Sequence, residues 1–216
     1  MTNARRILRR LLRTPGFLIL AVGTLAVGIG ANTAIFTVVN NVAIQSLSYP
    51  DADELVGISH TAPGVSGIGD RLGASPGMYF TYLDENETFE HIGLWANRGS
   101  AVTGVGEPEQ VRTLVVTYGT LDALNVPPLL GRWFSPVDDS PESEQTVVLS
   151  YAFWQRKFGG DVGVIGRQLA VDATPRTVIG VMPQGFALLD GPAFMLPARL
   201  DRQKGLLGEF SYPGIG

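Results

Sequence analysis

The sequence predicts an α+β fold, in which one N-terminal transmembrane helix is followed by a mixed α+β extracytoplasmic domain of antiparallel strands and short helices. The first observation is that no charged residue lies between Arg13 and Asp51. The second is that, after Pro50, apolar runs of strand length alternate with short helix signals. None of these signals reaches the roughly 10–15 residues of the crossover helices in a doubly wound sheet, which favours α+β over α/β.

The uncharged run is long enough to cross a bilayer. From Gly16 to Val42 an α-helix would extend about 40 Å, whereas the hydrocarbon core is about 30 Å thick. We therefore assign residues 16–42 to a transmembrane helix whose more polar C-terminal end forms the base of a stalk. A cleaved signal peptide is the alternative, but its apolar region is only about 7–15 residues long, and no clear cleavage site follows Leu20. The length therefore favours an uncleaved anchor.

A cluster of arginines precedes the apolar run, and on a helical wheel its members cover one face: Arg5, Arg6, Arg9, Arg10 and Arg13. The pattern predicts that residues 1–15 form a cytoplasmic amphipathic basic segment on the membrane surface of the inner leaflet. Because basic residues next to a span stay in the cytoplasm, the N-terminus is expected inside and Asp51 onward outside. A basic cluster can also bind nucleic acid, but the span directly behind it favours the bilayer.

The apolar helix itself has two faces. Small and polar residues gather in one sector and define a predicted helix-packing face: Gly23, Ala26, Gly30, Thr33, Ala34, Thr37, Asn40 and Asn41. Small residues let helix backbones approach closely in lipid, and polar side chains can hydrogen-bond between helices. This face predicts that the helix packs against other transmembrane helices, whereas a lone anchor with incidental small residues is the alternative.

Residues 50–216 are expected to form one domain outside the cytoplasm. The first fifty residues hold five of the 16 Lys and Arg and none of the 20 Asp and Glu, so the domain is acidic. An acidic surface argues against a nucleic-acid partner and against lying flat on an anionic leaflet. The chain has no cysteine, which excludes disulfides and cysteine-ligated metal sites.

In the first half of the domain, strand-like runs occur at residues 54–60, 89–96, 100–105 and 110–117. Ser75 followed by Pro76 predicts the start of a short helix that continues to Leu83. A second short helix is expected at residues 119–124 and should end at Asn125, because asparagine tolerates the left-handed backbone conformation of a helix end.

The second half gives clearer signals. Residues 146–149 predict a buried strand, and Ser150 is expected to cap a helix that continues to Phe158 and ends at Gly159. Two alternating runs, at residues 168–172 and 176–182, flank residues 173–175 and predict a hairpin.

Candidate catalytic and metal-binding residues are few. His60 and His91 are the only histidines, and neither has a partner at a metal-ligand spacing. The glycine-rich residues 64–69 lack both the ending of a P-loop and the spacing of a GxSxG nucleophile elbow. The acidic loop lacks the spacing and glycine of an EF-hand: Asp138, Asp139, Glu142 and Glu144. We therefore expect no enzyme, no catalytic residue, no cofactor and no metal.

The sequence resembles a known family in four segments, which span most of the chain from about Arg5 to Pro197. They are RRLLRTPGFLILAVGTLAVGIGANTAIFTVVNNV, LSYPDADELVGI, GEPEQVRTLVVTYGTLDALNVPPLLGRWFSPVDD and VVLSYAFWQRKFGGDVGVIGRQLAVDATPRTVIGVMPQGF. Together they look like the first transmembrane helix and the MacB-like periplasmic core domain of a MacB/FtsX-type ABC transporter permease. Departures from the family pattern are Ala-Thr-Pro at the predicted hairpin turn and Asn125 at a helix end, where the family commonly has glycine.

The resemblance implies a membrane subunit without catalytic activity in the bacterial inner (plasma) membrane. Its periplasmic domain, residues 50–216, would couple a separate cytoplasmic ABC ATPase to substrates or partner proteins outside the cytoplasm. Partners of the helix would be other transmembrane helices of the same permease or a second copy. Since family members continue with three more helices, we expect either the N-terminal part of such a permease or a truncated relative.

Two other functions remain open from the residues alone. A secreted or membrane-anchored periplasmic binding domain would act without transport. A hydrolase would depend on His60 or His91, and no motif in the sequence supports one.

Overall fold

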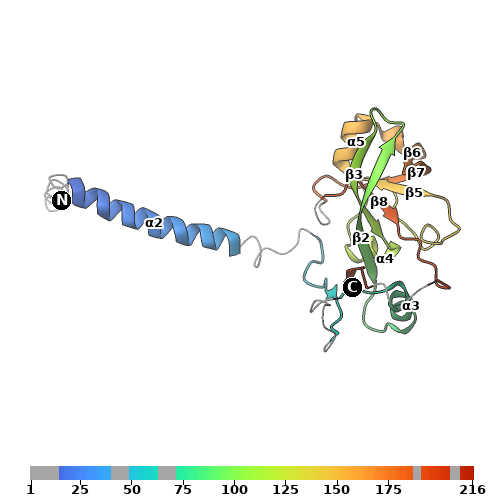
Figure 1. Ribbon diagram of the computed structural model, residues 1–216, viewed down its shortest axis with the longest axis horizontal. Coiled ribbons are helices and arrows are strands. Elements are labelled where there is room, and N and C mark those ends of the chain that lie inside the picture. The colour runs from blue at the N-terminus through green and yellow to red at the C-terminus, as the bar shows by residue number, and fades with distance from the viewer. Residues whose placement is uncertain (1–14, 40–48, 63–71, 187–190, 205–209) are drawn as a thin grey trace. The chain divides into compact units, whose positions relative to one another are not determined.

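The computed structural model describes residues 15–39, 49–62, 72–186, 191–204 and 210–216. The chain divides into two compact units, Met1–Ser48 and Tyr49–Gly216. In the first unit, helix α2 (Pro15–Val39) is continuous over 25 residues (Figure 1). It begins on a proline, whose missing N–H is not needed in the first turn of a helix. The predicted transmembrane helix is therefore helical up to Val39, and residues 40–42 lie outside the described residues.

The second unit is a mixed sheet with short helices, which confirms the α+β fold class. Its strands are β1 (Gly57–Ile58), β2 (Gly93–Thr103), β3 (Glu109–Val116), β4 (Leu130–Gly131), β5 (Thr146–Leu149), β6 (Gln168–Val171), β7 (Thr174–Val181), β8 (Phe194–Pro197) and β9 (Gly214–Ile215). Its helices are α3 (Pro76–Glu85), α4 (Tyr118–Ala123), α5 (Tyr151–Phe158) and the 3-10 turn η2 (Val162–Val164).

Six of the strands form a closed circuit of pairings. The order around it is β2, β3, β8, β5, β7 and β6, and β6 pairs with β2 again through Val102↔Val171 and Thr103↔Ala170. Two of these pairs, β3 with β8 and β5 with β7, are parallel, so the predicted antiparallel pattern holds for the other four. Closing a sheet in this way removes most of its exposed edges.

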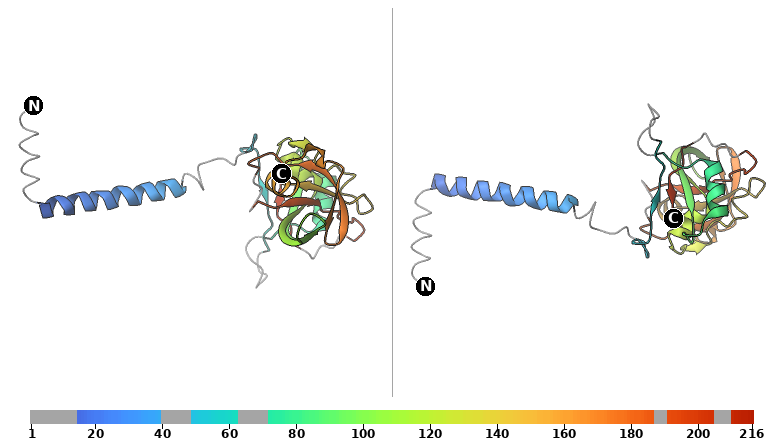
Figure 2. Two further views of the ribbon diagram at one scale, coloured as in Figure 1. Left: turned by 90° about the horizontal axis from the view of Figure 1, so that it is seen from above. Right: turned by 90° about the horizontal axis from the view of Figure 1, so that it is seen from below.

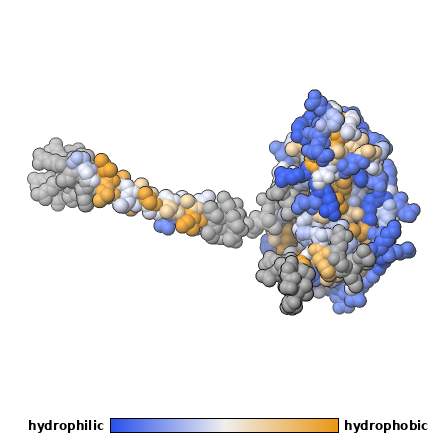
Figure 3. Space-filling view, viewed as in Figure 1, coloured by the Kyte–Doolittle hydropathy of each residue, from blue (hydrophilic) through white to orange (hydrophobic). Residues whose placement is uncertain are grey.

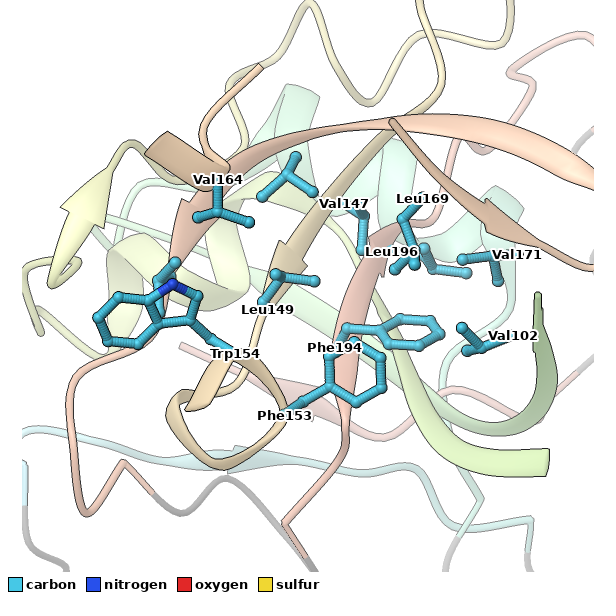
Figure 4. Packing of buried hydrophobic residues seen from close by; sticks show 12 residues of the cluster. Val102, Val147, Leu149, Phe153, Trp154, Val164, Leu169, Val171, Phe194 and Leu196 are labelled. Atoms are coloured by element: carbon cyan, nitrogen blue, oxygen red, sulfur yellow. The ribbon is translucent and has the colours of Figure 1, made fainter. Parts of the chain in front are cut away.

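Side chains alternate across the strands and divide the domain between an inner and an outer core. Val147 and Leu149 of β5 face the inside of the circuit, whereas Val148 faces the outside, where it packs with Leu121 of α4 and with Leu124 just after that helix. The inner core, which we call the barrel core, consists of buried residues from five strands, α5 and η2 (Figure 4): Val102, Val147, Leu149, Phe153, Trp154, Val164, Leu169, Val171, Val178, Val181, Phe194 and Leu196. Because successive side chains of a strand point to opposite faces, one strand contributes residues to both the inner and the outer core.

Helices α5 and α3 pack against different hydrophobic clusters of the domain. Phe153 of α5 meets Phe194 edge-on, with ring centroids 5.6 Å apart, and so places α5 against the barrel core (Figure 4). Tyr79 of α3 packs in a third cluster with Leu94 and Ala96 of β2. Figure 2 shows the domain from two further sides, with α3 lying outside the strands.

The predicted N-caps and the predicted end of α5 are confirmed, whereas α3 continues past Leu83 to Glu85 and α4 ends at Ala123. Ser75 and Ser150 cap α3 and α5, because their hydroxyl oxygens accept from the backbone N–H groups of Met78 and Phe153, at 3.3 and 3.2 Å. Gly159 ends α5 with a left-handed φ of 61°. Asn125, just beyond α4, has a positive φ of 47°.

Two strand predictions are wrong. Residues 89–96 and 100–105 were expected as separate strands, but β2 runs unbroken between them because exposed Asn97, Arg98 and Gly99 continue the pairing with β3. Residues 54–60 were expected as one strand, but only Gly57–Ile58 pairs, with β9. Three short strands, β4, β8 and β9, were not anticipated.

The hairpin of β6 and β7 is confirmed, but its turn lies earlier than expected. Asp172 and Ala173 form the turn, with φ of 51° and 61°, while Thr174 and Pro175 already belong to β7. Asp172 is held in place by Ala101 of β2: its N–H donates to the Ala101 carbonyl, and its Oδ1 accepts from the Ala101 N–H at 2.8 Å. A contact distant in sequence therefore selects the turn.

Candidate functional site

Helix α2 is the clearest candidate for a functional element. Within the described residues it is the one helix long and apolar enough to cross a membrane, with a mean hydropathy of 1.9 over Ile19–Thr37. None of that window is buried. A core helix of a soluble domain would be largely buried, so α2 has the properties of a membrane span or a signal sequence. Figure 3 shows apolar residues along its length, whereas the face of the domain in view mixes hydrophilic and apolar residues.

The hydroxyl groups of α2 are all satisfied within the helix. Thr24, Thr33 and Thr37 each donate to the carbonyl four residues earlier, at 2.9, 2.8 and 2.8 Å. A hydroxyl that returns its hydrogen bond to its own helix can enter hydrocarbon without leaving a polar group unpaired. These three threonines are therefore compatible with lipid.

Most of the predicted helix-packing face lies on α2 and is exposed: Gly23, Ala26, Gly30, Thr33, Ala34 and Thr37. A Cβ placed on Gly23 or Gly30 would meet no atom within 4 Å, so the backbone is open to a neighbour there. Use of this face by a partner stays a prediction. Asn40, Asn41 and the predicted membrane-surface arginines lie outside the described residues: Arg5, Arg6, Arg9, Arg10 and Arg13.

In the domain, the carboxylate of Asp138 organises its own loop. Arg132 donates to both Asp138 oxygens, at 2.6 and 3.0 Å, and Ser135 donates its N–H and its hydroxyl to Oδ2, at 2.8 and 2.6 Å. Burial opposes ionisation, but these hydrogen bonds outweigh it and lower the pKa of Asp138 to about 2. The side chain is only 5% exposed. Both oxygens of this buried carboxylate therefore already accept hydrogen bonds from within the domain.

Asp139 joins two other segments. Its carboxylate accepts from the N–H of Tyr118, at the start of α4, and from the N–H of Arg199, at 3.2 and 2.7 Å. Burial raises the pKa of Asp139 despite these hydrogen bonds. Asp139 therefore ties the loop to α4 and to the segment after β8.

Sequence reasoning missed Arg199, which completes this arrangement. Its guanidinium donates to the carbonyls of Ser140 and Ser143, at 3.1 and 2.8 Å, and to that of Pro141. Its backbone has a positive φ of 52°. No local pattern marks a residue that contacts a loop more than fifty positions earlier, so only the fold identifies it.

The two histidines lie apart and have different surroundings. His60 lies between the Gly73 carbonyl, 3.2 Å from Nδ1, and the Tyr82 hydroxyl at Nε2. Because a carbonyl only accepts, Nδ1 donates to the Gly73 carbonyl, and Nε2 is hydrogen-bonded to the Tyr82 hydroxyl. His60 thus connects the segment before α3 to α3 itself.

His91 lies on an acidic part of the surface. With Asp122 and Asn125 it lines two adjoining hollows of about 540 and 620 Å³. Burial raises the pKa of Asp122, and the charge of His91 opposes that shift. Asp51, Glu54 and Glu90 line the first hollow as well. Within the described residues, no cluster of three His, Asp or Glu side chains has a metal-binding arrangement.

Comparisons with known proteins match both units of the chain. The family model of the MacB-like periplasmic core domain matches residues 18–211. No match was found among curated proteins.

Solved structures share the fold of the domain. The periplasmic region of MacB from Actinobacillus actinomycetemcomitans has a TM-score of 0.52 and 14% identity, covering 74% of this chain and 72% of that one. The extracellular domain of the noncanonical ABC-type transporter YknZ from Gram-positive bacteria has a TM-score of 0.52 and 13% identity, covering 74% and 81%. A domain of a putative permease from Porphyromonas gingivalis has a TM-score of 0.52 and 17% identity, covering 78% and 74%.

Proposed function

The chain belongs to the family of MacB-like periplasmic core domains of ABC-type transporter permeases, and from this membership we propose that it is a non-catalytic membrane subunit of such a transporter. The observation that carries the proposal is the extent of the match. It begins at residue 18, inside α2, and continues through the domain to residue 211, so an apolar helix and the periplasmic core belong to one family unit. This arrangement supports an anchored domain rather than a free one.

The proposed orientation follows from charge. The arginines before α2 favour the cytoplasmic side, so the chain after α2 is expected on the opposite side. Residues 1–15 would lie on the inner leaflet, residues 16–42 would form the span and stalk base, and residues 50–216 would lie outside the cytoplasm.

In the proposed mechanism, a separate cytoplasmic ATPase drives the domain. Helix α2 is continuous over 25 residues, and an α-helix with intact backbone hydrogen bonds resists bending. Displacement of its cytoplasmic end would therefore move its other end. The domain would couple this movement to a substrate or a partner protein outside the cytoplasm.

Membrane topology can be tested with single cysteines, because the chain has none of its own. Glu107, an exposed residue in the turn between β2 and β3, would be changed to cysteine. In intact spheroplasts, a membrane-impermeant maleimide should label Glu107→Cys. The matched control, Thr2→Cys, should be labelled only after the membrane is opened. Labelling of Thr2→Cys but not Glu107→Cys in intact spheroplasts would refute the orientation.

The same samples distinguish an anchor from a secreted domain. An uncleaved anchor should be recovered in the membrane fraction at the full-length mass. A soluble product lacking α2 would contradict the proposal and support a secreted binding domain.

A further inference from the structure

Arg176 is a partly buried cation at one end of the barrel core. It lies on β7 directly opposite Leu169 of β6, and paired residues of neighbouring strands point to the same face of a sheet. Leu169 is fully buried in the barrel core, and so is Val178, two residues after Arg176 on the same strand. Because side chains alternate along a strand, the Arg176 side chain leaves β7 toward the inside of the circuit.

The guanidinium group of Arg176 lacks an anionic partner within the part of the chain that the structure describes. Its Nε is buried and forms no hydrogen bond. No ion pair between described side chains includes it. Arginine keeps its charge at neutral pH, and a buried charge is costly unless an opposite charge and hydrogen bonds accompany it.

The charges around Arg176 do not compensate for its own. Burial lowers the pKa of Arg176, the charge of Arg199 lowers it further, and the charge of Asp172 opposes both effects. Arg199 is itself partly buried, and its guanidinium donates to the carbonyls of Ser140 and Ser143, which are neutral groups. Two positive charges therefore lie near each other in a domain that is otherwise acidic.

Strand pairing brings both arginines to the same end of the circuit. Strands β5 and β7 are parallel, and β8 is antiparallel to β5, so the start of β7 lies at the same end as the last residues of β8. Arg176 is the third residue of β7, and Arg199 follows the last residue of β8 by two positions.

Two carboxylates at this end of the circuit accept hydrogen bonds from other groups. Asp172 Oδ1 accepts from the Ala101 N–H at 2.8 Å, and Glu144 Oε1 accepts from the Thr177 hydroxyl at 2.5 Å. Neither carboxylate forms an ion pair with Arg176. A bound anion would therefore supply the charge that these side chains do not.

We propose that Arg176, with Arg199 beside it, binds a small oxyanion, a carboxylate or a phosphate, at this end of the barrel core. The inference goes beyond the proposed function, because it does not depend on a membrane span. A guanidinium group presents N–H groups in a planar fork that matches two oxygens of a carboxylate or a phosphate. Since Nε is enclosed, the terminal Nη groups of Arg176 would donate to the anion.

The test is urea unfolding of the full-length chain in detergent, followed by tryptophan fluorescence. Sodium phosphate or sodium acetate is added while sodium chloride keeps the ionic strength constant. An anion that binds only the folded state raises the urea midpoint with the logarithm of its concentration above its Kd. A rise with phosphate alone would identify a phosphate group as the ligand, and a rise with acetate would identify a carboxylate.

In Arg176→Gln, the Kd for the anion should be at least about tenfold higher than in the wild type, because hydrogen bonds from a charged group are lost. Arg176→Lys keeps the charge but not the fork, so it should respond more weakly than the wild type. Arg167→Gln is the matched control, because the Arg167 guanidinium is exposed and paired with Asp161. It should respond as the wild type does.

Stability in chloride alone separates a binding role from a structural one. Arg176→Gln should be at least as stable as the wild type there, because it removes an unpaired buried charge. Salts also stabilise proteins by exclusion from the surface, but that effect is common to all variants. An equal anion response in the wild type and Arg176→Gln, or no response beyond this common effect, would overturn the inference.

Discussion

At the scale of single residues, two acidic neighbours behave in opposite ways. The pKa of Asp138 lies below its ordinary value of 3.8, at about 2, because hydrogen bonds from Arg132 and Ser135 outweigh the effect of burial. The pKa of Asp139 is raised because burial outweighs the backbone N–H groups that donate to it. Sequence alone treats them as one acidic pair, and only the positions of donors around each carboxylate separate them.

Asp138→Asn should destabilise the domain by about 1–2 kcal/mol at pH 7, because it removes the ion pair with Arg132. A lowered pKa stabilises the folded state above the ordinary value of 3.8, and this contribution is lost as the pH falls through about 2. The difference between wild type and Asp138→Asn should therefore be constant above about pH 5 and shrink toward pH 2.

Urea unfolding followed by tryptophan fluorescence measures this difference, since all three tryptophans lie in the domain. Glu142→Gln, at an exposed position of the same loop, is the control and should leave stability unchanged. A difference that grows on acidification would contradict the assignment.

At the scale of elements, the start of β2 depends on a close approach to α4. A Cβ on Gly93 would lie 2.2 Å from the Thr120 Cα, and one on Gly119 would lie 2.2 Å from the Ile92 carbonyl oxygen. The Thr117 hydroxyl accepts from the Leu94 N–H at 2.8 Å, and the Thr120 hydroxyl donates to the Leu94 carbonyl at 2.9 Å. Glycine is therefore required where the strand and the helix backbones meet.

Gly93→Ala should destabilise the domain by about 2–3 kcal/mol, because the added methyl group meets backbone that cannot move aside freely. Gly99 of the same strand is a matched control, since a Cβ there meets nothing within 4 Å. Gly99→Ala should change stability by less than about 1 kcal/mol, with a gain more expected than a loss. Equal losses for both variants in urea unfolding would show that the contact with α4 is not the cause.

At the scale of the whole molecule, the chain combines an apolar helix with an acidic domain that has its own cores. All three hydrophobic clusters consist of residues from Tyr49 onward. The division at Ser48 and Tyr49 therefore separates a unit that depends on lipid from one that depends on its own packing.

Residues 49–216 expressed alone should consequently be soluble and monomeric and should unfold cooperatively. Their urea midpoint should match that of the domain in the full-length chain in detergent, because none of Ile19–Thr37 is buried. Tryptophan fluorescence and gel filtration provide the measurement. Aggregation, or a clearly lower midpoint, would mean that the first unit contributes to the stability of the domain.

Local signals predicted much of this structure. Helix α2, strands β3 and β5, and the ends of α3 and α5 all depend on residues close together in sequence, such as Ser75 and Ser150 with the N–H groups they cap. The hairpin turn was misplaced because its position depends on the contact between Asp172 and Ala101. Short strands such as β4 and β9 escaped prediction because two residues carry no periodic pattern.

The sequence by itself determined an uncharged span, its basic flank, an acidic domain and the α+β class, because hydropathy, charge and capping are properties of neighbouring residues. The tertiary structure decided the closed circuit of six strands and the placement of Arg199 against the acidic loop. Pairing and hydrogen-bond satisfaction join atoms that are distant in sequence or set by backbone geometry, so they are defined only once the chain is folded.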